Sequence, residues 1–179
     1  MMKPNKAIIQ FGGLGVGTHR FEFEVTDKFF ESRDYSEIKK ANIQVLVDFV
    51  KQNSVMTLNL QVKGVVTVPC DRCTGDLTLP IENSDSMYIK NGDPEESNES
   101  IIVLPEGETE VDLTEQFYEL IAVSVPMRRV PEELGITDHT CDEEVLKKLN
   151  NFSVEEEPGQ KNPNSNVWDE LKKIKFNNN

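Results

Sequence analysis

Two cysteines stand three positions apart in the segment Cys70-Asp71-Arg72-Cys73-Thr74-Gly75. A cysteine pair at this spacing can direct both thiolates at one tetrahedral metal ion. Gly75, two residues after the second cysteine, allows the backbone to turn left-handed so that its N–H groups face the sulfur atoms. The segment therefore indicates a metal-binding knuckle.

A zinc site needs about four ligands, and the remaining candidates are His19, His139 and Cys141. His139 and Cys141 are separated by one residue, far along the chain from the knuckle. One interpretation is a Cys₃His zinc site made of Cys70, Cys73, His139 and Cys141. The other is a tight hairpin whose reduced, metal-free cysteines pack as small hydrophobic side chains.

Two other kinds of site fit the sequence less well. A thioredoxin-like redox pair begins a helix, whereas alternating apolar residues predict a strand after this pair, at residues 77–81. The glycine-rich residues 12–17 lack the Gly-Lys-Ser/Thr ending of a phosphate-binding loop and run into a strand-like alternation at residues 21–25. They predict a turn before an edge strand.

A catalytic use of the cysteines is an alternative hypothesis. A zinc- or thiol-dependent enzyme acting on RNA would place a metal-bound water near a general base, and Asp71 and Asp76 are the nearest carboxylates in the sequence. The chain contains no His-Glu-x-x-His motif. The sequence favours a protein that is not an enzyme.

The elements that must position the knuckle are mainly strands. Apolar alternation with short connections predicts an antiparallel meander, with strands at residues 21–25, 43–50, 58–68, 77–81 and 87–89. The predicted fold class is α+β, an antiparallel β-meander sheet with two or three helices packed against it.

Two helices are predicted after the strands. Asp112 and Glu115 form a capping-box pattern before an apolar stripe that ends at Pro126. Thr140 is the predicted N-cap of the second helix, which places Cys141 at the first helical position. The stripe expected to be buried in the second helix is Val145, Leu146 and Leu149.

Composition divides the chain into three parts. Residues 1–152 are expected to form one α+β domain, with an acidic mobile loop near residues 91–100. Residues 153–166 have the composition of a flexible linker, and residues 167–179 predict a short amphipathic tail helix. Trp168 on that helix either packs on the domain or anchors a partner.

The formal net charge of −13 is concentrated in residues 85–119, which hold eleven acidic residues and one lysine. Such a surface repels phosphate backbones and attracts basic proteins, although a solvated face that keeps the protein soluble is an alternative interpretation. DNA is not an expected partner. Weak contacts with RNA or a partner are open to Arg72, Arg128 and Arg129.

Three cysteines make an odd number for a disulfide framework and favour a reducing compartment. The N-terminal residues lack the apolar core of a signal peptide, and no stretch has membrane-spanning length. We therefore expect a cytoplasmic protein that does not contact membranes.

Several motifs in this order resemble the YceD family of large-subunit ribosomal RNA accumulation proteins. They are the Gly-Leu-x-x-Gly-x-His motif and Phe-rich strand at residues 13–23, the Cys-x-x-Cys segment at residues 70–73, the helix that follows Asp112, the late Cys141, and Trp-x-x-Leu-Lys-Lys at residues 168–173. The asparagine-rich lead into Trp168 departs from the family pattern.

The resemblance implies a cytoplasmic, non-enzymatic factor that supports synthesis or stability of large-subunit rRNA, with no catalytic residue. Cysteine pairs vary within the family, and here only Cys141 stands where some relatives carry a second pair. The charge adds the hypothesis that the partner is a basic ribosomal protein or ribonucleoprotein surface, with the knuckle presenting Arg72. A protein-interaction module without any link to ribosomes is the remaining alternative.

Overall fold

The computed structural model describes residues 6–52 and 55–152 of the chain. The chain divides into two compact units, residues 1–142 and residues 143–179. The predicted boundaries at residues 152 and 166 stay predictions.

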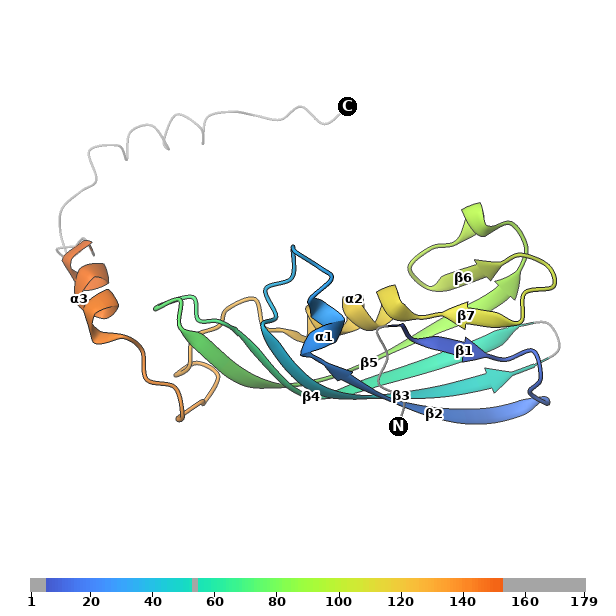
Figure 1. Ribbon diagram of the computed structural model, residues 1–179, viewed down its shortest axis with the longest axis horizontal. Coiled ribbons are helices and arrows are strands. Elements are labelled where there is room, and N and C mark those ends of the chain that lie inside the picture. The colour runs from blue at the N-terminus through green and yellow to red at the C-terminus, as the bar shows by residue number, and fades with distance from the viewer. Residues whose placement is uncertain (1–5, 53–54, 153–179) are drawn as a thin grey trace, which may run out of the picture. The chain divides into compact units, whose positions relative to one another are not determined.

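A five-stranded sheet forms most of the first unit (Figure 1). Its strand order is β2-β3-β4-β5-β6, and the first four strands form an antiparallel meander. The last strand pairs in parallel with its neighbour, which a pure meander does not predict. The strands are β2 (Gly17–Thr26), β3 (Lys40–Lys51), β4 (Met56–Pro69), β5 (Asp76–Asn91) and β6 (Ile101–Leu104).

A second, two-stranded sheet lies on the same side of the large sheet as α1 (Asp27–Phe30) and α2 (Thr114–Ser124) (Figure 1). It pairs β1 (Ile8–Gln10) with β7 (Glu110–Asp112) in antiparallel orientation. Together with the helices, these strands confirm the predicted α+β fold class.

The sheet forms because apolar residues alternate along each strand, which directs them to one face. In β3, the side chains of Ile43, Val45, Val47 and Phe49 are completely buried. Phe49 lies opposite Leu58 of β4, and the other buried residues of the two strands continue in the same register. The opposite face of the sheet carries mostly polar side chains. The strand predicted at residues 43–50 is thus confirmed as part of β3.

Two helices cover the apolar face in the first unit (Figure 1). The short α1 (Asp27–Phe30) buries Phe29 and Phe30. The longer α2 (Thr114–Ser124) buries Phe117, Leu120 and Ile121. It ends two residues before Pro126, as the sequence predicts.

The start of α2 differs from the predicted capping box. The N-cap residue is Leu113, and Asp112 accepts a hydrogen bond from the backbone N–H of Thr114 at 2.9 Å. Glu115 does not complete the box, because its carboxylate pairs with Arg33 at 2.6 Å. Arg33 is buried, and its guanidinium lies over the rings of Phe29 and Tyr118. A tertiary ion pair therefore replaces the predicted local contact.

The two loop regions singled out in the sequence have defined local structure. The glycine-rich turn precedes β2, which is an edge strand of the sheet, as predicted. The acidic region near residues 91–100 contains a 3₁₀ turn, η1 (Pro94–Glu96), capped by the side chain of Asp93. Its mobility stays a prediction.

The described part of the second unit is α3 (Glu143–Phe152). It starts two residues after Cys141, so the prediction that Cys141 occupies the first helical position is wrong. The predicted buried stripe is also wrong: Val145 and Leu146 are half-buried and Leu149 is exposed. The linker at residues 153–166 and the tail helix at residues 167–179, with Trp168, lie outside the described residues. Among the described helices, none combines the length and apolarity needed to span a bilayer.

Candidate metal centre

The four predicted ligands meet at one end of the sheet. Cys70 and Cys73 stand in the turn between β4 and β5, while His139 and Cys141 lie in the segment that follows α2. One ligand atom from each residue lies within 4.8 Å of all the others. The two cysteines of the turn are buried, and the other two residues are half-buried. The structure thus brings together residues that the sequence separates widely.

A short hydrogen-bonded turn shapes the knuckle. The backbone N–H of Thr74 donates to the Cys70 carbonyl at 2.9 Å, and the N–H of Cys70 donates to the Gly75 carbonyl at 2.8 Å. The left-handed residue is Thr74, with φ of 59°, and not Gly75 as expected. Gly75 has another role: a Cβ there would lie 3.3 Å from the sulfur of Cys73 and 3.6 Å from the His139 ring. A side chain at this position would crowd the ligands.

His139 is held by both of its ring nitrogens. Nδ1 lies 3.2 Å from the backbone carbonyl of Asp76, and Nε2 lies 3.3 Å from Sγ of Cys73. Because a carbonyl only accepts, Nδ1 carries a proton. A metal ion would be bound through the Nε2 lone pair of this neutral tautomer, whereas in the metal-free cluster Nε2 donates to the Cys73 thiolate when it carries a proton.

The cluster favours the thiolate of Cys73 over that of Cys141. Burial raises the pKa of Cys73, but hydrogen bonds from His139 and from the N–H groups of Gly75 and Asp142 outweigh it and lower this pKa to about 6. Burial and the neighbouring sulfur atoms of Cys73 and Cys70 raise the pKa of Cys141 to about 11. A divalent cation would relieve this repulsion, because metal binding displaces thiol protons.

Residues inside the knuckle also hold the segment that supplies His139 and Cys141. The N–H of Asp71 donates to the Arg129 carbonyl at 3.1 Å, and the Asp71 carboxylate accepts from the N–H of Arg129 at 2.6 Å and from its Nε at 3.0 Å. Arg72 pairs with Glu132 at 2.5 Å. The sequence interpretation missed this positioning role of Asp71, and only its place between the cysteines could have suggested it.

All three arginines proposed for RNA or partner contact are engaged in ion pairs. Arg129 pairs with Glu37 and Asp71, and only 16% of its side chain is exposed. Arg128 pairs with Glu133 at 3.0 Å and remains largely exposed, and Arg72 is partly exposed. Their contact role stays a prediction.

The carboxylates near the cysteines are also occupied. Asp71 binds Arg129, and the side chain of Asp76 pairs with Lys39 at 2.5 Å. With four protein ligands, the cluster matches a closed structural site, whereas catalytic zinc sites keep one position for water. The geometry therefore offers a metal four ligands, but no unengaged carboxylate at Asp71 or Asp76 to act as a base.

Comparison with known proteins identifies the family to which the chain belongs. No curated protein matches the chain, and neither does any solved structure. A family model described as the large ribosomal RNA subunit accumulation protein YceD matches residues 58–175. This match includes most of β4, the knuckle, α2, His139 and Cys141, and it covers well over half of the sequence. The chain belongs to the YceD family, whose name implies a role in accumulation of the large ribosomal RNA subunit.

Proposed function

We propose that the protein supports accumulation of large-subunit rRNA by binding a basic ribosomal protein, or a ribonucleoprotein surface rich in basic protein, without catalysing a reaction. The family supplies the link to ribosomal RNA. The distribution of charge supports a protein partner over naked RNA.

The observation behind this proposal is that the arginine side chains near the knuckle already form ion pairs in a strongly acidic chain. The chain has a net charge of −13, and the arginines nearest the knuckle are already paired with carboxylates. Binding phosphates through these arginines would break those pairs, and the surrounding negative potential opposes it. A basic protein meets no such barrier.

The cysteine–histidine cluster is proposed to hold one structural zinc ion. Cys70, Cys73, Cys141 and Nε2 of His139 supply the donor set of a Cys₃His site. Bound zinc would tie the turn between β4 and β5 to the segment after α2. Its role is to stabilise this end of the sheet.

A tagged pull-down from growing cells tests the proposed partner. One half of the lysate is treated with nuclease, and ribosomal proteins and large-subunit rRNA are quantified in both halves. A basic ribosomal protein that survives nuclease supports the proposal. Loss of all ribosomal material on nuclease treatment would indicate that the protein binds RNA, and Arg72, Arg128 and Arg129 would then be the residues expected to contact it. Absence of ribosomal material from both halves, with normal rRNA levels on gene deletion, would support an unrelated interaction module.

The enzymatic alternative has its own test. A zinc- or thiol-dependent nuclease would shorten large-subunit rRNA incubated with the purified protein, and a Cys70→Ser, Cys73→Ser double variant would not. We expect intact rRNA with both proteins.

A further inference from the structure

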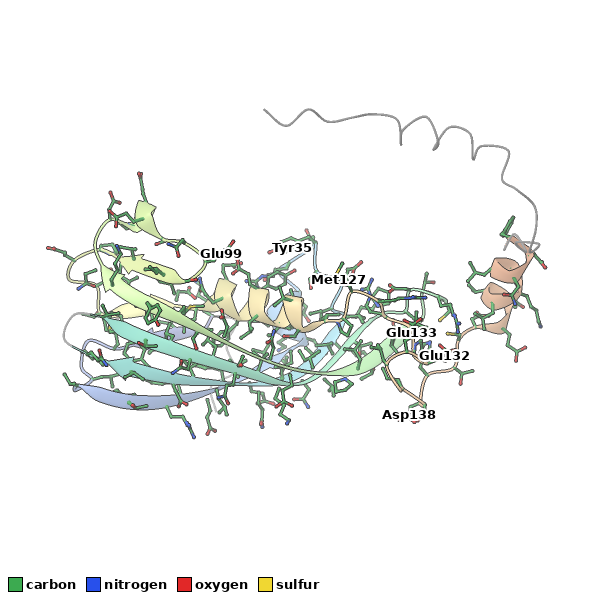
Figure 2. All side chains as sticks on the ribbon, turned by 180° about the vertical axis from the view of Figure 1, so that it is seen from behind. Tyr35, Glu99, Met127, Glu132, Glu133 and Asp138 are labelled. Carbon is green, nitrogen blue, oxygen red and sulfur yellow. The ribbon has the colours of Figure 1, made fainter. Side chains whose placement is uncertain are left out.

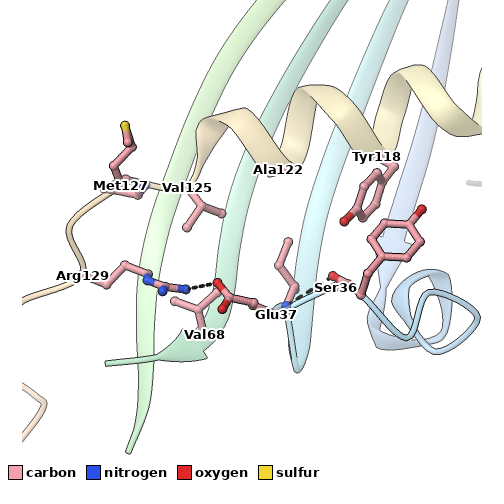
Figure 3. A pocket seen from close by; sticks show the side chains of 11 residues that line it. Ser36, Glu37, Val68, Tyr118, Ala122, Val125, Met127 and Arg129 are labelled. Atoms are coloured by element: carbon pink, nitrogen blue, oxygen red, sulfur yellow. Dashed lines mark hydrogen bonds and ion pairs between the residues drawn. The ribbon is translucent and has the colours of Figure 1, made fainter. Parts of the chain in front are cut away.

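The outward side of α2 is flanked by two hollows. The first, of about 360 Å³, lies between the loop after α1 and the segment after α2, and Tyr35, Tyr118, Val125 and Met127 contribute to its walls (Figure 3). The second, of about 300 Å³, lies on the other flank and is lined in part by Asp85, Glu99, Glu119 and Val123. Residues of α2 line both hollows, so they form one surface, which we call the α2 surface.

Large apolar side chains are exposed on this surface. Met127 is fully exposed, Val123 is 72% exposed and Tyr35 is 69% exposed. Figure 2 shows Tyr35 and Met127, together with Glu99, on the side of the sheet that carries α2. Single exposed apolar residues are ordinary, but several around one helix and its grooves indicate a binding surface.

The first hollow, which has both apolar and polar walls, is built on a fixed frame. The Arg33 guanidinium lies 4.7 Å from the centre of the Tyr118 ring, and the Tyr35 ring meets Tyr118 edge-on with centroids 5.5 Å apart. At the opposite end, Arg129 pairs with Glu37 (Figure 3), and it also pairs with Asp71. A groove with walls held in this way loses little conformational freedom when a ligand binds.

Unbalanced negative charge borders the second hollow. Asp85, Glu99 and Glu119 converge there from β5, the loop before β6 and α2, and none forms an ion pair with another described residue. Gln116 also lines this hollow, and its buried side-chain oxygen has no hydrogen-bond partner among the described residues. These acceptors suit lysine or arginine side chains, which supply donors and positive charge.

We propose that the α2 surface binds a basic amphipathic segment of a ribosomal protein. Apolar side chains of the segment enter the groove between Tyr35 and Met127, and its lysine or arginine residues pair with Asp85, Glu99 and Glu119. This inference rests on the proposed function and names the site and the partner chemistry. The same carboxylates disfavour RNA and a second copy of this acidic chain.

Site-specific crosslinking of the full-length protein tests the site. A photoreactive benzoylphenylalanine replaces Val123 in one version and Val16 in the other, since Val16 is 70% exposed and belongs to the turn before β2. The probe is the acid-extracted, RNA-free protein fraction of large ribosomal subunits. We expect position 123 to crosslink a lysine- or arginine-rich ribosomal protein and position 16 to give at least about tenfold less adduct.

Two matched pairs of variants separate apolar from charged contacts. The ribosomal protein identified by crosslinking is titrated against each variant, and its affinity is measured. Val123→Asn is compared with Val16→Asn. The double variant Glu99→Lys, Glu119→Lys is compared with the double variant Glu22→Lys, Glu106→Lys, whose two positions are exposed outside the α2 surface. We expect each α2-surface variant to weaken binding about tenfold or more. Circular dichroism and thermal unfolding verify the fold of every variant.

The outcomes separate the two proposals. If the two double charge variants lose binding equally and Val123→Asn has no effect, the α2 surface is not the binding site, but the proposal that the acidic protein binds a basic protein still stands. Equal crosslinking from positions 16 and 123 would lead to the same conclusion. If the fraction shows no RNA-independent binding to the unmodified chain, the proposed function itself fails.

Discussion

At the residue scale, the candidate metal centre depends on how few ligands the chain offers. It contains three cysteines and two histidines, and four of these five residues converge. His19 is the exception, because it lies in β2 and its Nε2 contacts the backbone carbonyl of Gly15. The two histidines therefore provide a matched comparison.

His139→Ala is expected to lower the zinc affinity of the purified protein by at least about tenfold, because even outer-shell partners contribute tenfold or more. His19→Ala should leave the affinity unchanged. Elemental analysis and competition with a chromophoric chelator measure both. Equal affinities for the two variants would contradict a site that includes His139, and a zinc-free wild-type protein purified without chelator would contradict the site as a whole.

The thiols of the reduced, metal-free protein should differ in pH dependence. The pKa of Cys73 is lowered to about 6 and that of Cys141 is raised to about 11, and only the thiolate reacts with iodoacetamide. Alkylation of Cys73 should therefore rise around pH 6 and level off above it, while that of Cys141 keeps rising into alkaline pH. Peptide mass spectrometry follows each site. Parallel pH profiles would show that His139 does not stabilise the Cys73 thiolate.

At the element scale, the long strands depend on close backbone packing at one point of β4. A Cβ on Gly64 would lie 2.2 Å from the Asn42 carbonyl oxygen and 2.6 Å from Cα of Ile43. Both contacts are with the backbone of β3, so no side-chain rotation can relieve them. This glycine lets two strands approach more closely than any other residue would allow.

Gly64→Ala is expected to destabilise the protein by about 3 kcal/mol or more, at the upper end of overpacking effects. Gly13→Ala is the control, because a Cβ there meets nothing within 4 Å. Urea unfolding followed by circular dichroism measures both free energies of unfolding. A Gly64→Ala protein as stable as the control variant would mean that β3 and β4 separate readily at this position.

The connection between the knuckle and the segment after α2 depends on Asp71. Its carboxylate accepts hydrogen bonds from the backbone and side chain of Arg129, and these hold the pKa of Asp71 below its usual value. A lowered folded-state pKa contributes stability that is present above the unfolded pKa and lost as the pH falls through the folded one. The contact between Asp71 and Arg129 should therefore weaken in acid.

Asp71→Ala is expected to reduce the free energy of unfolding at neutral pH by about 1–3 kcal/mol, because it leaves the backbone N–H of Arg129 without its acceptor and its guanidinium with Glu37 alone. The difference from wild type should shrink below about pH 4, where carboxylates protonate. Asp76→Ala is the control, since its carboxylate forms only an exposed ion pair with Lys39 worth about 1 kcal/mol or less. Equal effects of the two substitutions would show that Asp71 is no more than a surface charge.

At the scale of the whole molecule, charge governs which macromolecules can approach. The purified chain is expected to bind protein-free large-subunit rRNA no more tightly than background at physiological salt, because its net charge is −13. Binding of the RNA-free ribosomal protein fraction should instead weaken as salt rises, since screening reduces attraction between opposite charges. Filter binding and biolayer interferometry across a salt series measure the two. Tight rRNA binding that weakens with salt would reverse this assignment.

The sequence by itself determined strands β2, β3 and β4, the glycine-rich turn before β2, α2 and the family, whereas the two strands predicted at residues 77–81 and 87–89 are one continuous strand, β5. Each follows from local information: alternation in β3 and β4, helical spacing in α2, and motifs spread over much of the chain. It also identified all four residues of the cluster, because so few candidates exist. Local patterns failed where a distant residue competed, as when Glu115 paired with Arg33 rather than completing a capping box.

Only the tertiary structure decided which distant residues meet. Spacing rules cannot show that His139 and Cys141 return to the knuckle, because closing a long loop depends on contacts such as Asp71 with Arg129 that the sequence does not order. The parallel pairing of β6 and the α2 surface arise in the same way, from segments that are neighbours only in space. Strands and helices follow from patterns among neighbouring residues, whereas contacts between residues far apart in the sequence exist only once the chain has folded.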